Sequence, residues 1–147
     1  MLEQETIILN AETIPRVEID FMNNTHFEEL EIVNKLGENI SAYQATDDEM
    51  AQISQDLQDW LGHTIPHFES ENELMLKTGL PAYGVHSEEH KIALSGMKGV
   101  IQTWEDNHDI EQLANYVFKQ WPTWFNAHVS SMDMMTAKFA KMNGYTD

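Results

Sequence analysis

Two pairs of metal-ligand residue types lie close together between residues 67 and 90. His67 and Glu71 are four residues apart, and so are His86 and His90. On an α-helix, side chains four residues apart lie on the same face, so each pair can direct two ligand atoms toward one point. The segment TGLPAYG between the pairs contains two glycines and a proline, which predicts that one helix ends there and the chain reverses into the next. The pairs therefore predict two antiparallel helices that bring three imidazoles and a carboxylate to a shared interior, as in a metal site.

The elements that must hold these residues are recognisable from the spacing of apolar side chains. Apolar residues recur at helical intervals in four segments, residues 19–37, 47–75, 83–107 and 110–142. Because the connections are short and strand patterns are almost absent, the sequence predicts an all-α, up-down-up-down four-helix bundle. A short N-terminal arm at residues 1–15 precedes the bundle, and residues 1–147 are expected to form a single domain.

Individual residues mark where these helices begin or bend. Thr46 or Asp47 can cap the second helix, because Glu49 follows Thr46 by three residues in a capping-box arrangement. Pro66 lies inside the second helical segment, and Pro122 lies inside the fourth. A proline lacks the backbone N–H and crowds the preceding turn, so we expect both helices to bend at these positions.

Composition excludes several classes of site and partner. Without cysteine the chain cannot form disulfides, zinc–thiolate sites, iron–sulfur clusters or a thiol nucleophile, so a transition metal needs nitrogen and oxygen ligands. Eight basic residues against 25 acidic residues give a formal charge of −17, which repels phosphate backbones and anionic lipid surfaces. We therefore expect neither nucleic acid nor membrane as a partner. The N-terminal residues lack a signal-peptide pattern and no apolar run reaches transmembrane length, so the cytoplasm is the expected location.

Further ligand types lie on the other two predicted helices. His26 lies on the first helix, and His128 and Asp133 lie on the fourth. Bundles build metal sites from side chains on facing helices, and imidazole together with carboxylate suits iron. The spacing of His128 and Asp133 is unfavourable, because five residues turn about 140° around a regular helix and place the two side chains on different faces. Regular-helix geometry alone therefore does not place Asp133 in the site.

Taken together, these elements resemble the hemerythrin family, specifically its single-domain bacterial members. The resemblance rests on His26, on HFESE at residues 67–71, on HSEEH at residues 86–90 and on WFNAHVSSMD at residues 124–133. It covers roughly residues 19–142, which is nearly the whole chain. A single His-x-x-x-Glu pair is a weak signal, whereas seven ligand residues in this order on four helices are a strong one.

The resemblance implies a non-haem di-iron centre, with two iron ions joined by an oxo or hydroxo bridge. The implied ligands of one iron are His86, His90 and His128, those of the other are His26 and His67, and the bridging carboxylates are Glu71 and Asp133. The second iron keeps an open position at which dioxygen binds reversibly. The implied function is oxygen storage, delivery or sensing rather than catalysis, with a redox protein or an oxygen-using protein open as a partner.

The same scaffold leaves two other functions open. A di-iron enzyme, such as an oxidase, a peroxidase or a nitric oxide scavenger, would use the same ligands. A metal-buffering protein would hold zinc or manganese in them. A spectrum of the reduced protein after exposure to air separates binding from turnover, and elemental analysis identifies the metal.

Around the open position we expect Glu29, Leu30, Phe68, Trp124 and Phe125. The apolar side chains would exclude water from bound dioxygen. Glu29 stands where oxygen-carrying relatives usually have an aliphatic residue, and a helical step of three from the first histidine could bring its carboxylate near the metal, to ligate it, order water or transfer a proton. We favour an outward Glu29, with Leu30 in the wall; an inward Glu29 would favour oxidation chemistry over oxygen carriage.

Two histidines remain outside this ligand set. His63 lies one turn before His67, so a role behind that ligand, or as an extra ligand, competes with a plain surface or packing role, which we favour. His108 falls in the turn after the third helix and is expected to be solvated.

Overall fold

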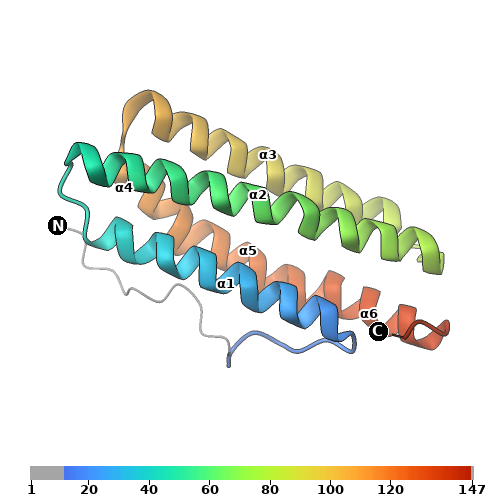
Figure 1. The fold of residues 1–147 in the computed structure, drawn as a ribbon. Coiled ribbons are helices and arrows are strands. Elements are labelled where there is room, and N and C mark those ends of the chain that lie inside the picture. Colours follow the sequence, from blue (N-terminus) through green and yellow to red (C-terminus); the bar gives the residue numbers. More distant parts are fainter. Residues whose placement is uncertain (1–11, 147) are drawn as a thin grey trace.

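The computed structural model of the protein describes residues 12–146, which form four roughly parallel rods (Figure 1). Three rods are single helices, and the fourth is a succession of helical segments. The elements are α1 (Asp20–Ser41), α2 (Asp47–Thr78), α3 (Tyr83–Asn107), α4 (Ile110–Asn115), η1 (Tyr116–Gln120), α5 (Trp121–His128), η2 (Val129–Asp133) and α6 (Met134–Met142). The predicted all-α, up-down-up-down bundle is confirmed, while most of the N-terminal arm expected at residues 1–15 lies outside the described residues.

The connections between the rods have local causes. The Thr46 side chain accepts a hydrogen bond from the backbone of Glu49, and the Glu49 carboxylate accepts one from the backbone of Thr46, so the predicted capping box is present. Gly79 follows α2 with a φ of 74°, a left-handed conformation that glycine adopts without strain. Asp109 caps α4 by accepting hydrogen bonds from two backbone N–H groups of its first turn. Each of these residues helps to reverse the chain between antiparallel rods.

Helix α1 is longer than its sequence predicts. The helix continues past Gly37 and ends at Ser41. Leu36 and Ile40 are fully buried in the core, so tertiary packing outweighs the low helical propensity of the glycine between them. Helix α2 likewise runs as one element through Pro66.

The fourth rod contains two π-helical turns, η1 and η2, which the sequence pattern did not predict. At the end of η1 the backbone N–H of Trp121 donates to the carbonyl of Tyr116, five residues earlier. Pro122, which has no N–H to donate, follows immediately at the start of α5. The rod predicted for residues 110–142 is therefore present, but at two places its backbone hydrogen bonds join residues five apart instead of four apart.

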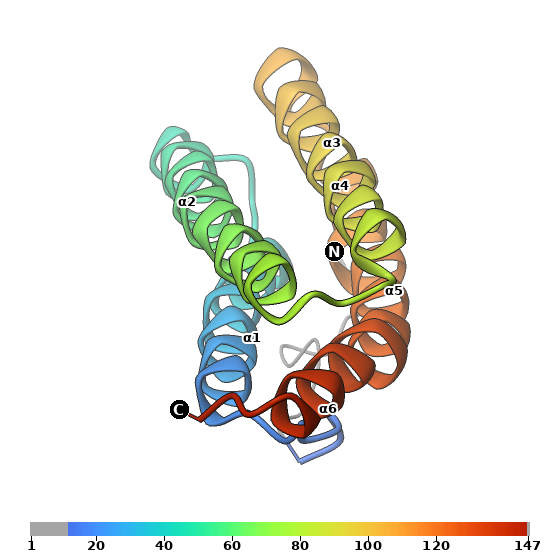
Figure 2. The same ribbon diagram turned by 90° about the vertical axis from the view of Figure 1, so that its right-hand side faces the viewer.

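The four rods surround one interior, as seen from the end at which α2 gives way to α3 (Figure 2). Large side chains such as Trp60, Trp104 and Met97 are fully buried within it. Among residues 12–146, no helix is both long enough and apolar enough to cross a membrane.

Candidate metal centre

Seven ligand-type side chains meet in the interior of the bundle. Every rod contributes to this cluster, and all seven side chains are buried. They are His26 from α1, His67 and Glu71 from α2, His86 and His90 from α3, His128 from α5 and Asp133 from η2. The structure thus brings together all seven residues of the ligand set that the resemblance implied.

Asp133 reaches the cluster because the helix changes its hydrogen-bonding pattern just before it. The π turn η2 begins directly after His128 and ends at Asp133. In a π turn the hydrogen bonds join residues five apart, so residues at that spacing return to the same face. Asp133 Oδ1 consequently lies 3.1 Å from His128 Nε2, although a regular α-helix would have separated the two side chains.

The seven side chains form two groups that share both carboxylates. The first group is Glu71, His86, His90, His128 and Asp133, and the second is His26, His67, Glu71 and Asp133. Glu71 directs Oε1 toward His90, at 3.2 Å, and Oε2 toward His67, at 3.0 Å. Asp133 directs Oδ1 toward His86, at 3.1 Å, and Oδ2 toward His26, at 2.9 Å. Each carboxylate therefore has one oxygen facing each group of histidines.

The spacing of these atoms fits ligands around cations. Two ligands that bind one metal at about 2.1 Å and at a right angle are about 3 Å apart. The Nε2 atoms of His86 and His90 lie 3.1 and 3.2 Å from Nε2 of His128. Three imidazole nitrogens that each present a lone pair do not stabilise one another at such separations, whereas a cation between them would accept all three lone pairs.

Two buried carboxylate oxygens give a second test of the fit. Glu71 Oε1 and Asp133 Oδ1 accept no hydrogen bond, although imidazole nitrogens lie within 3.2 Å of each. Short distances without hydrogen-bond geometry mean that these groups point past one another, as groups directed at a common centre do. Buried polar atoms normally have partners, so the two oxygens are consistent with metal ligands.

Most of the cluster histidines are held from behind through Nδ1. His86 Nδ1 lies 2.8 Å from Thr136 Oγ1, and His90 Nδ1 lies 2.9 Å from Asn72 Oδ1. The remaining contacts are His128 Nδ1 to Glu89 Oε1, at 2.7 Å, and His67 Nδ1 to Glu29 Oε1, at 3.3 Å. An acceptor on Nδ1 fixes the proton there and leaves Nε2 free to bind a metal. Nδ1 of His26 is buried and has no hydrogen-bond partner.

The charges within the cluster compensate one another. Burial lowers the pKa of His26, but hydrogen bonds and charges from Asp133 and Glu71 outweigh burial and raise this pKa to about 9. Burial raises the pKa values of Glu71 and Asp133, but the surrounding histidines hold both below their usual range. The carboxylates are therefore ionised and His26 carries a proton at neutral pH, so positive charge already occupies the place where a cation would bind.

The expectation that Glu29 points outward is wrong. Glu29 is 1% exposed, and its Oε1 accepts hydrogen bonds from His63 Nδ1 at 2.7 Å and from His67 Nδ1 at 3.3 Å. Burial raises the pKa of Glu29, but the hydrogen bonds and charges of these histidines outweigh burial and lower it to about 2. The carboxylate is buried because α2 supplies enough donors to replace water. It lies behind His67, on the side of the ring opposite Glu71.

The two histidines outside the ligand set behave differently from each other. The plain surface or packing role favoured for His63 is wrong, because His63 Nδ1 forms a hydrogen bond with the Glu29 carboxylate. This hydrogen bond raises the pKa of His63. Its side chain is 19% exposed, so it connects the buried Glu29 with solvent. His108 is exposed in the turn after α3, as predicted.

Aromatic rings cover the cluster on several sides. Phe68 stacks on His90, with ring centroids 4.1 Å apart, and Trp124 stacks on His128 at 4.6 Å. Phe125 meets His26 edge-on at 5.7 Å. Trp124 thus lies on the three-histidine group and Phe125 on the two-histidine group. Phe68 contacts both groups, because its ring centroid also lies 5.1 Å from that of His67. Leu30 is also buried.

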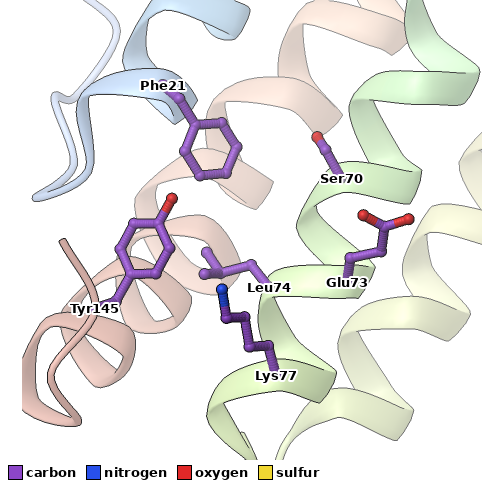
Figure 3. Close-up of a pocket in the computed structure, with 6 residues that line it drawn as sticks. All are labelled: Phe21, Ser70, Glu73, Leu74, Lys77 and Tyr145. Carbon is purple, nitrogen blue, oxygen red and sulfur yellow. The ribbon is translucent and has the colours of Figure 1, made fainter. Parts of the chain in front are cut away.

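A surface cleft of about 330 Å³ lies beside the end of α2 that carries the ligands. Figure 3 shows its side chains, which come from the start of α1, from α2 and from the segment after α6. They are Phe21, Ser70, Glu73, Leu74, Lys77 and Tyr145. None of the seven cluster residues lines this cleft, so we treat it as separate from the candidate metal centre.

The sequence did not reveal the residues that support the histidines. Asn72, Thr136 and Glu89 belong to helices other than those of the histidines they contact. Spacing along one helix identifies residues that share a face, but it does not pair residues across helices. The hydrogen-bond partners could therefore be found only from the assembled bundle.

The fold and the cluster together define a class: a four-helix bundle with a candidate two-metal site of histidines and bridging carboxylates. The chain is similar to the bacteriohemerythrin of Aquifex aeolicus (strain VF5), to which it is 25% identical over 134 residues, or 90% of this chain and 97% of the relative. No protein-family model matches the chain, and no solved structure matches it. The likeness to the bacteriohemerythrin confirms the resemblance to the hemerythrin family that the ligand motifs indicated.

Proposed function

We propose that the chain is a non-haem di-iron protein that binds dioxygen reversibly. The observation that carries this proposal is the pair of shared carboxylates, because Glu71 and Asp133 each direct one oxygen at each histidine group. His86, His90 and His128 would hold one iron, and His26 and His67 the other. When bound, a reduced iron pair supplies the electrons that dioxygen needs for reversible binding.

The unequal ligand sets support a binding position on one side of the site. The three-histidine group offers five ligand side chains, and the two-histidine group offers four. A metal with fewer protein ligands keeps a position for a small exogenous molecule. Phe125, which contacts His26, excludes water from the two-histidine group and so slows the replacement of bound dioxygen by water.

The test is an absorption spectrum of the reduced, iron-loaded protein in cycles of air and argon. We expect a band that forms in air, persists, and disappears when oxygen is removed. A Glu71→Ala, Asp133→Ala variant is the control and should not form the band. Irreversible conversion of the wild-type protein to a ferric spectrum within one cycle would contradict reversible binding.

One observation favours an alternative, a di-iron enzyme such as an oxidase, a peroxidase or a nitric oxide scavenger. Glu29 is buried and ionised beside His67, where oxygen-carrying relatives usually have an aliphatic residue. Its position behind the ring, and not between the two groups, favours binding over turnover. Steady consumption of oxygen or peroxide in the presence of a reductant would support the enzyme.

A further inference from the structure

Glu29 on α1 is held by four hydrogen-bond donors on α2. Its Oε2 accepts from Trp60 Nε1 and from Thr64 Oγ1, the latter at 2.9 Å. Its Oε1 accepts from Nδ1 of His63 and of His67. The donors stand at positions 60, 63, 64 and 67, which form one stripe along a helix. Both oxygens are therefore saturated, and the carboxylate joins α1 to α2 at a fixed place.

This clamp sets the orientation of His67. Because Nδ1 donates to Glu29, the opposite nitrogen, Nε2, faces the cluster and lies 3.0 Å from Glu71 Oε2. A carboxylate on the outer nitrogen of a metal-binding imidazole fixes its tautomer and increases its strength as a ligand. The arrangement therefore prepares His67 to bind a cation through Nε2.

Glu29 differs from the other groups that hold the cluster histidines. Asn72 and Thr136 are neutral partners, and the carboxylate of Glu89 is 36% exposed, so solvent screens its charge. Glu29 is the buried anion among the Nδ1 partners in residues 12–146. A buried negative charge acts on a nearby cation through a low dielectric and stabilises its higher charge state.

We infer that Glu29 is a positioning residue that fixes His67 and lowers the midpoint potential of the iron held by His26 and His67. The inference rests on the proposed di-iron function. It assigns to Glu29 a role through His67 and not direct contact with dioxygen. It also explains how the chain tolerates a glutamate in this wall: the carboxylate is directed away from the shared centre.

The test compares midpoint potential and metal affinity in three iron-loaded proteins: the wild type, Glu29→Gln and Glu89→Gln. In Glu29→Gln the amide oxygen still accepts hydrogen bonds from Trp60 and Thr64, so the amide nitrogen faces His63 and His67. Because the amide N–H groups are donors, they disfavour a proton on Nδ1 of His67, and it is this proton that leaves Nε2 free to bind the metal. We expect a more positive potential and metal affinity weaker by on the order of 10- to 100-fold. Glu89→Gln, the matched control at an exposed partner, should shift both quantities in the same direction by less.

The outcomes separate this inference from the function on which it rests. A wild-type protein that binds no iron would contradict both. A wild type with two irons per chain, and a Glu29→Gln variant with the same potential and affinity, would overturn the inference alone. A third metal ion per chain that disappears in His63→Ala would also overturn it, because Glu29, His63 and His67 would then be ligands of a separate cation.

Discussion

Deleting Ser130 is the most informative perturbation of the backbone, because it removes one residue from the π turn η2. Ser130 is exposed, and it lies between His128 and Asp133. A π turn amounts to one extra residue inserted in an α-helix. The deletion should convert η2 into regular α-helix and leave the flanking segments in register.

The magnitude follows from helix geometry. At the present spacing of five residues, a regular helix would turn Asp133 about 140° away from His128, whereas a spacing of four residues leaves about 40°. The deletion therefore keeps Asp133 on the face of the cluster by a different route. Deletion of Glu69, an exposed residue between His67 and Glu71, is the matched control. It should turn everything after it in α2 by about 100°, which moves Glu71 from one side of His67 to the other, away from Asp133, and turns the buried Leu74 and Met75 off the core face.

The assay is iron content per folded chain, with helicity measured by circular dichroism. We expect the Ser130 deletion to retain two irons per chain and the Glu69 deletion to lose them. A Ser130 deletion that stays fully helical but binds no iron would refute the account of η2 as a one-residue insertion that aims Asp133.

Three further predictions concern the site and the frame. Because the pKa of His26 is raised to about 9, a cation that binds at pH 7 must displace the proton of His26, and binding should release protons. The apparent affinity of the protein for cobalt, measured by titration, should therefore increase from pH 6.5 to about pH 9, and the increase should be weaker in His26→Ala. Trp104→Ala, in the core, should destabilise the fold by about 3–5 kcal/mol in urea unfolding without changing iron per folded chain. Thr46→Ala removes the capping box and should reduce the free energy of unfolding by about 1 kcal/mol, an effect that Thr123→Ala on the exposed face of α5 should not reproduce.

The parts of the site that follow from regular helices were predictable from sequence. His67 with Glu71, and His86 with His90, have the spacing that places two side chains on one helical face. Four amphipathic segments with short connections predicted the bundle for the same reason. Asp133 was not predictable in this way, because its position depends on a π turn whose hydrogen bonds leave no periodic signal in the sequence.

Glu29 shows a second limit of sequence reasoning. A glutamate on an amphipathic helix is usually solvated, so the outward orientation was the natural prediction. Its burial depends on Trp60, His63 and Thr64, which come from another helix and replace the water that the carboxylate would lose. These donors meet Glu29 only when α1 and α2 are packed together, so the spacing of residues within either helix does not predict the burial of its carboxylate.

The central claim is that two cations share Glu71 and Asp133, and iron stoichiometry tests it most directly. Protein reconstituted with ferrous iron under argon, freed of excess metal and analysed for iron per chain should contain two iron ions. The Glu71→Ala, Asp133→Ala variant should retain fewer while remaining helical. A wild-type protein that takes up one iron or none, or a double variant that still holds two, would contradict the shared-carboxylate site.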